Sequence, residues 1–312
     1  MGEFDIIEKY FKHDAKHADV ELGVGDDCAI VNIPAGEQLI MSTDSLLESV
    51  HFPPQSNACD LGYRSCATAL SDIAAMGGSA RWASLALTLP NFEASWLSDF
   101  ASGFQRACAL DNTVLIGGDL TSGPLSVTWH ITGTVPRDTA MRRSGNAPGE
   151  LIFVTGELGG ASAAVDWLGS DQMPEDLWQA YWLPQPRLAF GRAIRPLASS
   201  CIDISDGLLG DLRHLLRASD TAAILDTDRV PIAKALTHIS PEDSLALALN
   251  GGDDYELCFT APKDNGETIT ELASRYDLSV SQIGEIVSGE DGAIITSKAG
   301  EVLVPASFEH FA

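Results

Sequence analysis

Several common phosphate-binding signatures are missing from this chain of 312 residues. No Gly-Lys dipeptide occurs in it, which excludes the P-loop, whose lysine follows a glycine. Gly23-Val24-Gly25 is followed by Asp26-Asp27-Cys28, so the dinucleotide fingerprint G-x-G-x-x-G is incomplete. The kinase motifs H-R-D and D-F-G and the hydrolase elbow G-x-S-x-G are also absent. Any nucleotide must therefore be held in another way.

Basic side chains are scarce. The chain has 19 Lys and Arg against 44 Asp and Glu, a net charge of -25. This charge disfavours binding along a phosphate backbone or at an anionic membrane, so we expect neither nucleic acid nor membrane as a partner. An acidic surface is often only a solubility feature. The alternative is that some carboxylates bind divalent cations, in which case an anionic substrate binds together with its metal.

Long apolar runs and paired cysteines are missing as well. No stretch approaches the roughly 18 apolar residues of a membrane span, and the first residues lack the basic and apolar regions of a signal peptide. The six cysteines show no C-x-x-C and no zinc-ligand spacing. Their apolar neighbours favour small core residues with free thiols. We therefore expect a cytoplasmic location.

A chain of 312 residues suits two domains of about 150 residues each. The polar segment 136–149 holds two Pro and two Gly, so we place the connection there and predict domains over 1–137 and 148–312. Mixed elements predict α/β or α+β folds in both. Expected strands are 38–41, 84–89, 113–116, 126–135, 151–155, 222–226, 256–260, 278–284 and 292–296. Expected helices include 4–11, 60–76, 93–110, 186–198, 207–218, 231–237, 242–249 and 265–276.

Short aspartate-containing segments recur along the chain, and we expect them to be loops. Each puts a carboxylate beside Gly, Ser or Thr, and Mg²⁺ prefers such compact oxygen ligands. Glycine also lets backbone amides approach phosphate oxygens. Ordinary turns and helix caps use the same residues, so the residues alone leave both interpretations open. The segments are Gly25-Asp26-Asp27, Ser42-Thr43-Asp44, Leu70-Ser71-Asp72, Gly117-Gly118-Asp119, Asp203-Ile204-Ser205-Asp206-Gly207 and Gly251-Gly252-Asp253-Asp254.

Two further positions are candidate ligand contacts. Arg143 lies in a glycine-containing segment and can clamp a phosphate, although a solvated linker charge explains it equally well. His51 precedes Phe52-Pro53-Pro54 and can contact a substrate, although a loop histidine is often simply exposed.

The segments occur in the order found in bacterial thiamine-monophosphate kinases, which the chain resembles over nearly its whole length. The resemblance also includes His51-Phe52, Arg143-Ser144-Gly145 and the extensions Ile73-Ala74-Ala75-Met76-Gly77 and Tyr255-Glu256-Leu257. It implies the two-domain α/β (α+β) fold of aminoimidazole-ribonucleotide synthetase and selenophosphate synthetase. In that fold the N-terminal domain forms a homodimer and the C-terminal domain is α+β. The implied reaction uses ATP to phosphorylate thiamine monophosphate, giving thiamine diphosphate and ADP.

The resemblance also implies which residues bind. Several Mg²⁺ ions would be held by Asp27, Ser42, Thr43, Asp44, Asp72, Asp119, Asp203 and Asp206. ATP would contact Gly118, Asp119, Arg143 and Ser205. The thiamine end would lie near His51, Asp253 and Phe308. Three positions depart from the family pattern: Asp253 stands for the usual Glu, Leu120 for a frequent Thr, and Phe308 for Tyr or Trp.

The implied mechanism is direct in-line transfer without a covalent catalytic residue, because both reactants are already anionic phosphates. One alternative is another enzyme of the same superfamily. Selenophosphate synthetase would carry a reactive cysteine near the N-terminus, whereas the first cysteine here, Cys28, follows the aspartate pair. A different alternative is a non-catalytic metal-binding protein. ADP release that depends on thiamine monophosphate distinguishes the three.

Overall fold

The computed structural model describes residues 3–12, 18–297 and 300–305. Contacts between Cα atoms divide the chain into two compact units. Unit 1 comprises Met1–Ile73 and Gly78–Asp138, and unit 2 comprises Ala74–Gly77 and Thr139–Ala312. Mixed helices and strands in both units confirm the expected α/β (α+β) class. None of the helices in the described ranges is long and apolar enough to cross a membrane.

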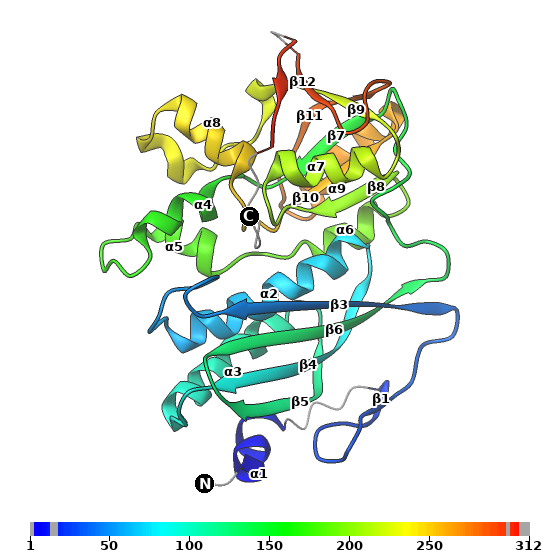
Figure 1. Ribbon diagram of the computed structural model, residues 1–312. Coiled ribbons are helices and arrows are strands. Elements are labelled where there is room, and N and C mark those ends of the chain that lie inside the picture. Colours follow the sequence, from blue (N-terminus) through cyan, green and yellow to red (C-terminus); the bar gives the residue numbers. More distant parts are fainter. Residues whose placement is uncertain (1–2, 13–17, 298–299, 306–312) are drawn as a thin grey trace. The chain divides into compact units, whose positions relative to one another are not determined.

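Unit 1 is built on a four-stranded sheet in the order β3-β6-β4-β5 (Figure 1). The strand β6 is antiparallel to both of its neighbours, whereas β4 and β5 are parallel. A parallel pair needs a crossover connection, and α3 provides it. The bounds are β3 (Glu37–Leu47), β4 (Ser79–Leu89), α3 (Ala94–Cys108), β5 (Val114–Ser122) and β6 (Ser126–Pro136).

One face of this sheet is covered by α3 and by α2 (Ala58–Ala75) (Figure 1). On β6, Val127, Trp129 and Ile131 are fully buried. The Trp129 indole donates a 3.0 Å hydrogen bond to Ser65 Oγ of α2 and packs 5.3 Å from the Phe104 ring of α3. The alternate residues Ser126, Thr128, His130 and Thr132 are only partly buried, whereas Thr134 near the end of the strand is buried. The alternation that predicted a half-buried strand over 126–135 is thus confirmed.

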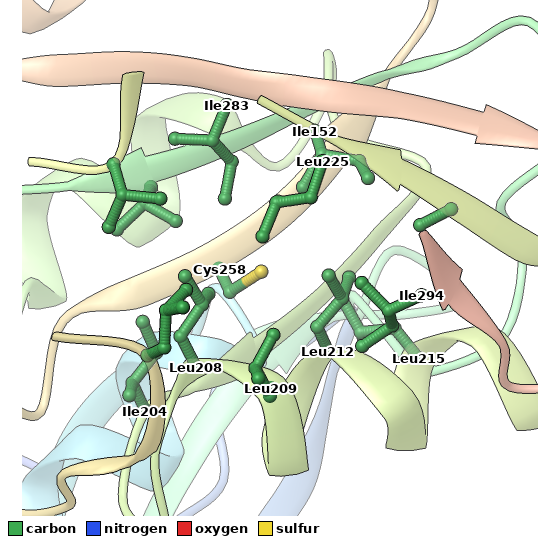
Figure 2. Close-up of a cluster of buried hydrophobic side chains, with 14 of the residues drawn as sticks. Ile152, Ile204, Leu208, Leu209, Leu212, Leu215, Leu225, Cys258, Ile283 and Ile294 are labelled. Carbon is green, nitrogen blue, oxygen red and sulfur yellow. The ribbon is translucent and has the colours of Figure 1, made fainter. Parts of the chain in front are cut away.

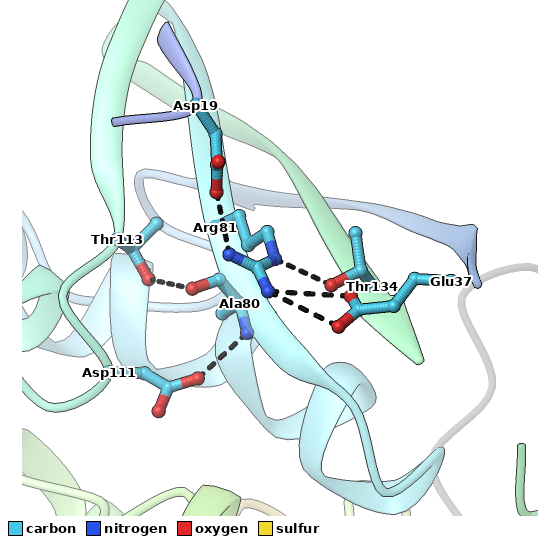
Figure 3. A network of polar contacts seen from close by, with 7 residues as sticks. All are labelled: Asp19, Glu37, Ala80, Arg81, Asp111, Thr113 and Thr134. Atoms are coloured by element: carbon cyan, nitrogen blue, oxygen red, sulfur yellow. Dashed lines mark hydrogen bonds and ion pairs between the residues drawn. The ribbon is translucent and has the colours of Figure 1, made fainter. Parts of the chain in front are cut away.

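A polar network fixes the segment that leads into the first aspartate pair (Figure 3). Arg81 of β4 forms a 2.8 Å ion pair with Asp19 and donates a 2.6 Å hydrogen bond to Thr134 Oγ1. Next to it, the backbone N–H of Ala80 donates to Asp111 Oδ2 at 2.8 Å, where β4 shifts its register against β6. The network anchors the chain just before β1. Short elements complete the unit: α1 (Glu3–Ile6), the π-helical turn η1 (Ile7–Phe11), β1 (Val20–Leu22) and β2 (Ile30–Val31).

Unit 2 contains a seven-stranded sheet in the order β13-β12-β9-β11-β7-β10-β8. Its neighbouring strands are antiparallel except for β9 and β12, which are parallel. The bounds are β7 (Leu151–Thr155), β8 (Ser200–Asp203), β9 (Ala222–Leu225), β10 (Leu257–Ala261), β11 (Val280–Val287), β12 (Ile294–Thr296) and β13 (Val302–Leu303).

Both faces of the seven-stranded sheet are packed. On one face, leucines of α7 join strand residues such as Ile152, Leu225 and Ile283 in a buried cluster (Figure 2). On the other face, Phe259 stacks on Phe153 at 5.3 Å and contacts Phe190 of α6 at 6.3 Å. The helices are α4 (Gly160–Ala164), α5 (Glu175–Trp182), α6 (Leu188–Ile194), α7 (Leu208–Arg217), α8 (Pro241–Asn250) and α9 (Gly266–Arg275). Short 3-10 turns lie at 165–167, 227–229, 234–238 and 263–265.

Three of the expected loops are not loops. Ser42-Thr43-Asp44 lies inside β3, Gly117-Gly118-Asp119 inside β5, and Leu70-Ser71-Asp72 inside α2, which confirms the helix expected over 60–76. In the two strands the backbone pairing continues past the Gly, Ser and Thr that suggested a turn. The helix expected near 231–237 is a 3-10 turn at 234–238. The strand β8 and the helix α5 were not predicted.

Candidate active site

A cavity of about 620 Å³ lies beside the edge strand β5 in unit 1. Its polar wall includes the carboxylates of Asp26, Asp27 and Asp119, and its apolar wall includes Phe11 and Leu85. All three aspartates are exposed to solvent. A cavity with an apolar wall and a carboxylate-rich side suits a ligand that carries both an apolar group and metal-bound phosphates.

The shape of β5 at this cavity depends on Gly118. Its φ is +152°, and a Cβ atom there would lie 1.9 Å from the carbonyl oxygen of Leu85 in β4. Only glycine permits this approach of the two strands. The approach sets the backbone of the next residue, Asp119, which pairs with Ala86. Gly118 and Asp119, two predicted ATP contacts, therefore lie together in the cavity wall.

The predicted ligands on β3 and α2 make contacts of their own. Ser42 Oγ donates a hydrogen bond to Asp72 Oδ2 and so joins the strand to the helix. Thr43 Oγ1 lies 2.8 Å from His130 Nδ1 of β6. Asp44 Oδ1 accepts the N–H of Ser45 at 2.9 Å. The structure thus brings Ser42 and Asp72 together and sets Thr43 beside a histidine.

Strand register determines which of these residues share a face of the sheet, because directly paired residues point to the same side. Asp44 pairs with Trp129, which is buried under the helices. Asp119 pairs with Ala86, which in turn pairs with Thr128 on the other face. Among the described residues no group of three or more His, Cys, Asp or Glu side chains lies close enough to hold one metal ion.

His51 follows β3 in a tight turn. Its Nδ1 accepts the backbone N–H of Leu47 at 3.0 Å, so the ring is fixed to the end of the strand. The predicted substrate contact is therefore a side chain whose ring orientation is fixed by the backbone.

In unit 2 the end of β8 and the loop that follows it carry Asp203, Ser205 and Asp206. The N–H groups of Ser205 and Asp206 both donate to Asp211 Oδ2 at 3.0 Å. Burial, opposed by these hydrogen bonds and assisted by the nearby Asp203 and Asp206, raises the pKa of Asp211 to about 7. Asp211 was not among the predicted site residues, although it holds the loop that contains two of them.

The segment that contains Asp253 packs against this loop. The N–H of Asp253 donates to the Ser205 carbonyl at 2.9 Å, and the N–H of Tyr255 donates to the Ile204 carbonyl at 2.8 Å. Asp253 and Tyr255 both have positive φ, 71° and 52°, which is uncommon outside glycine. The Tyr255 hydroxyl donates to Asp253 Oδ1 at 3.0 Å. These four residues, from two segments, are thus joined in one hydrogen-bonded unit.

Two other carboxylates of this segment have structural partners. Asp254 accepts the N–H of Gly159 at 2.9 Å, and burial of its carboxyl group raises its pKa well above the ordinary value. Glu256 forms a buried ion pair with Arg187, whose Nε donates at 2.7 Å, and accepts the Thr155 hydroxyl at 2.5 Å. These groups stabilise the turn that carries Asp253.

Two predicted contacts remain. Arg143 is exposed in the segment that leads into unit 2, and its charge is one of the influences that lower the pKa of His214 on α7, after desolvation. The segment is tied to the turn after α7 by the N–H of Gly145, which donates to Ser219 Oγ at 3.0 Å. Phe308 lies outside the described residues.

Comparison with known proteins supports both halves of this arrangement. Residues 25–135 match the family described as AIR synthase related protein, N-terminal domain, and residues 147–297 match its C-terminal domain. Thiamine-monophosphate kinase of Escherichia coli (strain K12) is 40% identical over 320 aligned residues, which cover 100% of this chain and 98% of that protein. This chain belongs to the thiamine-monophosphate kinase family. It is accordingly an enzyme of the kinase class, and the expected superfamily fold is confirmed.

Solved structures of thiamine-monophosphate kinases are similar to the chain as well. The enzyme from Stenotrophomonas maltophilia K279a has 37% sequence identity and a TM-score of 0.86, with 92% of this chain and 93% of that chain covered. AaThiL complexed with AMPPCP and TMP has 28% identity and a TM-score of 0.80, with 92% of each chain covered.

Sequence reasoning missed several residues at the two sites. Asp26 and Cys28 line the cavity next to Asp27, and only their place beside it could have pointed to them. Asp211 gave a clearer signal, because it is an acidic residue between Leu208 and Leu212 on the apolar face of a predicted helix. A carboxylate on such a face requires a hydrogen-bonding partner in the interior.

Proposed function

We propose that this chain transfers the γ-phosphoryl group of ATP to the phosphate of thiamine monophosphate, giving thiamine diphosphate and ADP. The observation that carries the proposal is the cavity of unit 1, where Asp27, Gly118 and Asp119 meet in a chain of this family. A structural relative, AaThiL, was crystallised with AMPPCP and TMP, which supports the same two substrates here.

Magnesium fits the residues available. The donor set consists of carboxylate and hydroxyl oxygens, the ligands that Mg²⁺ prefers. Mg²⁺ is usually bound through one or two protein carboxylates, with waters and substrate phosphates completing its shell. The absence of a three-carboxylate cluster from the described residues is therefore compatible with magnesium that binds together with ATP. We propose Asp27, Ser42, Thr43, Asp44, Asp72, Asp119, Asp203 and Asp206 as the ligand set for several ions.

The proposed chemistry is a direct in-line transfer. The bond between the γ-phosphorus and the oxygen that bridges to ADP breaks, and a bond from that phosphorus to a phosphate oxygen of thiamine monophosphate forms. When bound, magnesium neutralises the repulsion between the two polyanions. Gly118 allows the backbone to approach the nucleotide, while Arg143 and Ser205 contact its phosphates. No protein group needs to accept a proton, because the acceptor oxygen is already anionic.

The two ends of the substrates are assigned to different parts of the chain. We propose residues 1–137 as the metal, ATP and dimerisation domain and residues 148–312 as the α+β domain. His51, Asp253 and Phe308 are proposed to contact the thiamine end. The short Asp253 carboxylate replaces the longer Glu of the family, and its oxygen is held by the Tyr255 hydroxyl, which supports a fixed contact.

A homodimer is the proposed assembly. The face of β3 away from the helices carries Leu39, Met41 and Leu47, which are 37%, 63% and 43% exposed. An uncovered row of large apolar side chains favours burial against a second copy. Sedimentation velocity tests this, since a monomer at micromolar concentration contradicts the proposal. We propose a cytoplasmic location, which is supported by six free thiols, four of them buried.

The activity is tested by measuring ADP release with ATP and Mg²⁺, with and without thiamine monophosphate. The proposal requires release that depends on the acceptor, together with formation of thiamine diphosphate in equal amount. ADP release that is independent of thiamine monophosphate, or its complete absence, contradicts it. Thiamine, which lacks the acceptor phosphate, and precursors of aminoimidazole ribonucleotide serve as control acceptors. The precursors test the activity of another member of the superfamily.

A further inference from the structure

The loop between β8 and α7 is built around a side chain that does not reach its surface. Asp211 lies in the first turns of α7 and is only 2% exposed. Its Oδ2 accepts two hydrogen bonds, from the consecutive backbone N–H groups of Ser205 and Asp206, each at 3.0 Å. The two donors therefore point inward, toward the helix that follows them.

Consecutive N–H groups that converge after a strand and before a helix are a common anion-binding arrangement. In many nucleotide-binding loops a phosphate of the ligand occupies it. Here the position is already filled by a carboxylate oxygen of the same chain. Phosphate oxygens consequently cannot use the amides of Ser205 and Asp206, and this loop can reach ATP only through its side chains and the cations that they bind.

The rest of the loop backbone is fixed as well. The carbonyl groups of Ile204 and Ser205 accept N–H groups from Tyr255 and Asp253. Gly207 has a φ of +109°, and a Cβ atom there would lie 2.6 Å from the Asn250 carbonyl oxygen, so the turn into α7 requires glycine. The N–H groups of the loop thus bond to Asp211, and its carbonyl groups bond to the 253–255 segment. The backbone on both sides is fixed, so the side chains of Ser205 and Asp206 can leave it in only one direction each.

We propose that Asp211 is a positioning residue that converts this loop from a phosphate-binding loop into a cation-binding one. By occupying the two amides, it leaves Asp203, Ser205 and Asp206 to act through their side-chain oxygens. The inference rests on the proposed function of the same loop. The inference adds that the preference for magnesium-bound ATP over free ATP depends on Asp211, which contacts neither the nucleotide nor the metal.

The test compares Asp211→Ala with Asp211→Asn. The Ala variant frees both amides, whereas the Asn variant keeps a carbonyl oxygen that can accept them. Binding of AMPPCP is measured by calorimetry with Mg²⁺ and, separately, with EDTA, and kcat and the Mg²⁺ dependence of turnover are measured alongside. Ser244→Ala is the matched control, since it removes a buried hydrogen bond to the Leu236 carbonyl elsewhere in unit 2.

We expect Asp211→Ala to lose about 100-fold in kcat, the size expected for misplacing a reacting group by about 1 Å. We also expect it to need more Mg²⁺ for half-maximal turnover and to bind AMPPCP in EDTA more tightly than the wild type does. Asp211→Asn should stay within about tenfold of the wild type in kcat, because it retains the acceptor. A purely structural role of Asp211 would lower stability but would not change the Mg²⁺ dependence in the Ala variant and restore it in the Asn variant.

Three results would overturn the proposal: Ala and Asn variants that lose activity equally, an Ala variant with unchanged Mg²⁺ dependence, or a Ser244→Ala variant with the same change in metal dependence. If Asp211→Ala does not fold, the Asn variant alone decides. It should keep a Mg²⁺ requirement close to that of the wild type, and a clearly shifted Mg²⁺ requirement would count against the proposal. The AMPPCP titrations need no acceptor. They remain informative if the wild type fails to use thiamine monophosphate, so the two failures are distinguishable.

Discussion

In unit 1, the carboxylates of Asp27 and Asp119 line an open cavity and are exposed, whereas in unit 2 the carboxylates of Asp211 and Glu256 are buried and fully engaged with the chain itself. The first set is held by backbone geometry, as at Gly118. The carboxylates of the second set instead fix neighbouring parts of unit 2, because they accept backbone N–H groups or pair with an arginine. Substitutions of Asp27 or Asp119 should therefore change activity directly, whereas substitutions of Glu256 should change stability and those of Asp211 should act on activity through the loop that it positions.

The largest effect is expected for Asp44→Asn and Asp119→Asn. Each keeps its shape and loses one negative charge, so we expect kcat to fall by about 1,000-fold or more through lost metal and phosphate binding. The free energy of unfolding should change by less than about 0.5 kcal/mol, as is usual for such sites. Asp99→Asn, the same change at an exposed position of α3, is the control. Near-normal turnover at saturating Mg²⁺ in either variant would reject its assignment.

Glu256→Ala should show the opposite pattern and destabilise the protein. It removes the ion pair with the Arg187 guanidinium and the acceptor of the Thr155 hydroxyl. Breaking one side of a buried ion pair costs about 3–5 kcal/mol, which urea unfolding can measure. The comparison is Glu285→Ala, which breaks the exposed pair with Lys263 and should cost less than about 1 kcal/mol. Equal losses in the two variants would contradict the structural role of Glu256.

Adjacent glycines allow a sharper contrast within the cavity wall. A Cβ atom at Gly118 would collide with the Leu85 carbonyl, whereas one at Gly117 would meet nothing within 4 Å. We expect Gly118→Ala to lower the free energy of unfolding by about 2 kcal/mol or more and Gly117→Ala to have little effect. Thermal unfolding of the pair measures this. A stable Gly118→Ala variant would mean that β4 and β5 can separate without cost.

The smallest effect concerns the pH dependence of stability. Burial raises the pKa of Asp254 above its ordinary value of 3.8, so the folded state keeps this proton at pH values where the unfolded state has lost it. The contribution of Asp254 is therefore present below pH 3.8 and is lost as pH rises toward its raised pKa. Asp254→Asn removes this dependence. We expect the difference in unfolding free energy between wild type and variant to fall with rising pH, whereas parallel curves would contradict it.

Elements with a strong periodic pattern were predictable, and the reason is visible in their packing. The strand β6 alternates because Trp129 and its neighbours lie under helices while the intervening residues do not. The segment 42–44 was mistaken for a loop because Ser, Thr and Asp favour turns locally. Its pairing with β6, 87 residues away for Thr43 and His130, prevails over that preference. The strand β8 was missed because its four residues are buried on both sides and show no alternation.

The site could be predicted only through the ordered resemblance, since each aspartate segment alone also fits a turn. Local sequence gave no means of seeing that Asp44 and Asp119 lie on different sides of one sheet, because that depends on register between distant strands. Nor did it show that Asp254 and Glu256 have structural partners, Gly159 and Arg187, while the Asp253 carboxylate beside them accepts a hydrogen bond from the Tyr255 hydroxyl. Burial separates the roles of neighbouring residues of the same type.

The position of β7 between β11 and β10, in the interior of the unit 2 sheet, has a consequence for synthesis of the protein. Its two partners, β10 and β11, are made only after about a hundred further residues, which takes roughly 5–20 s of translation. In that interval both edges of the apolar strand β7 lack their native neighbours, and unpaired strand edges favour non-native pairing. The sheet of unit 1 is complete once Pro136 has been made. The nascent chain can therefore acquire its cavity early, while the later half is the part that needs protection from aggregation.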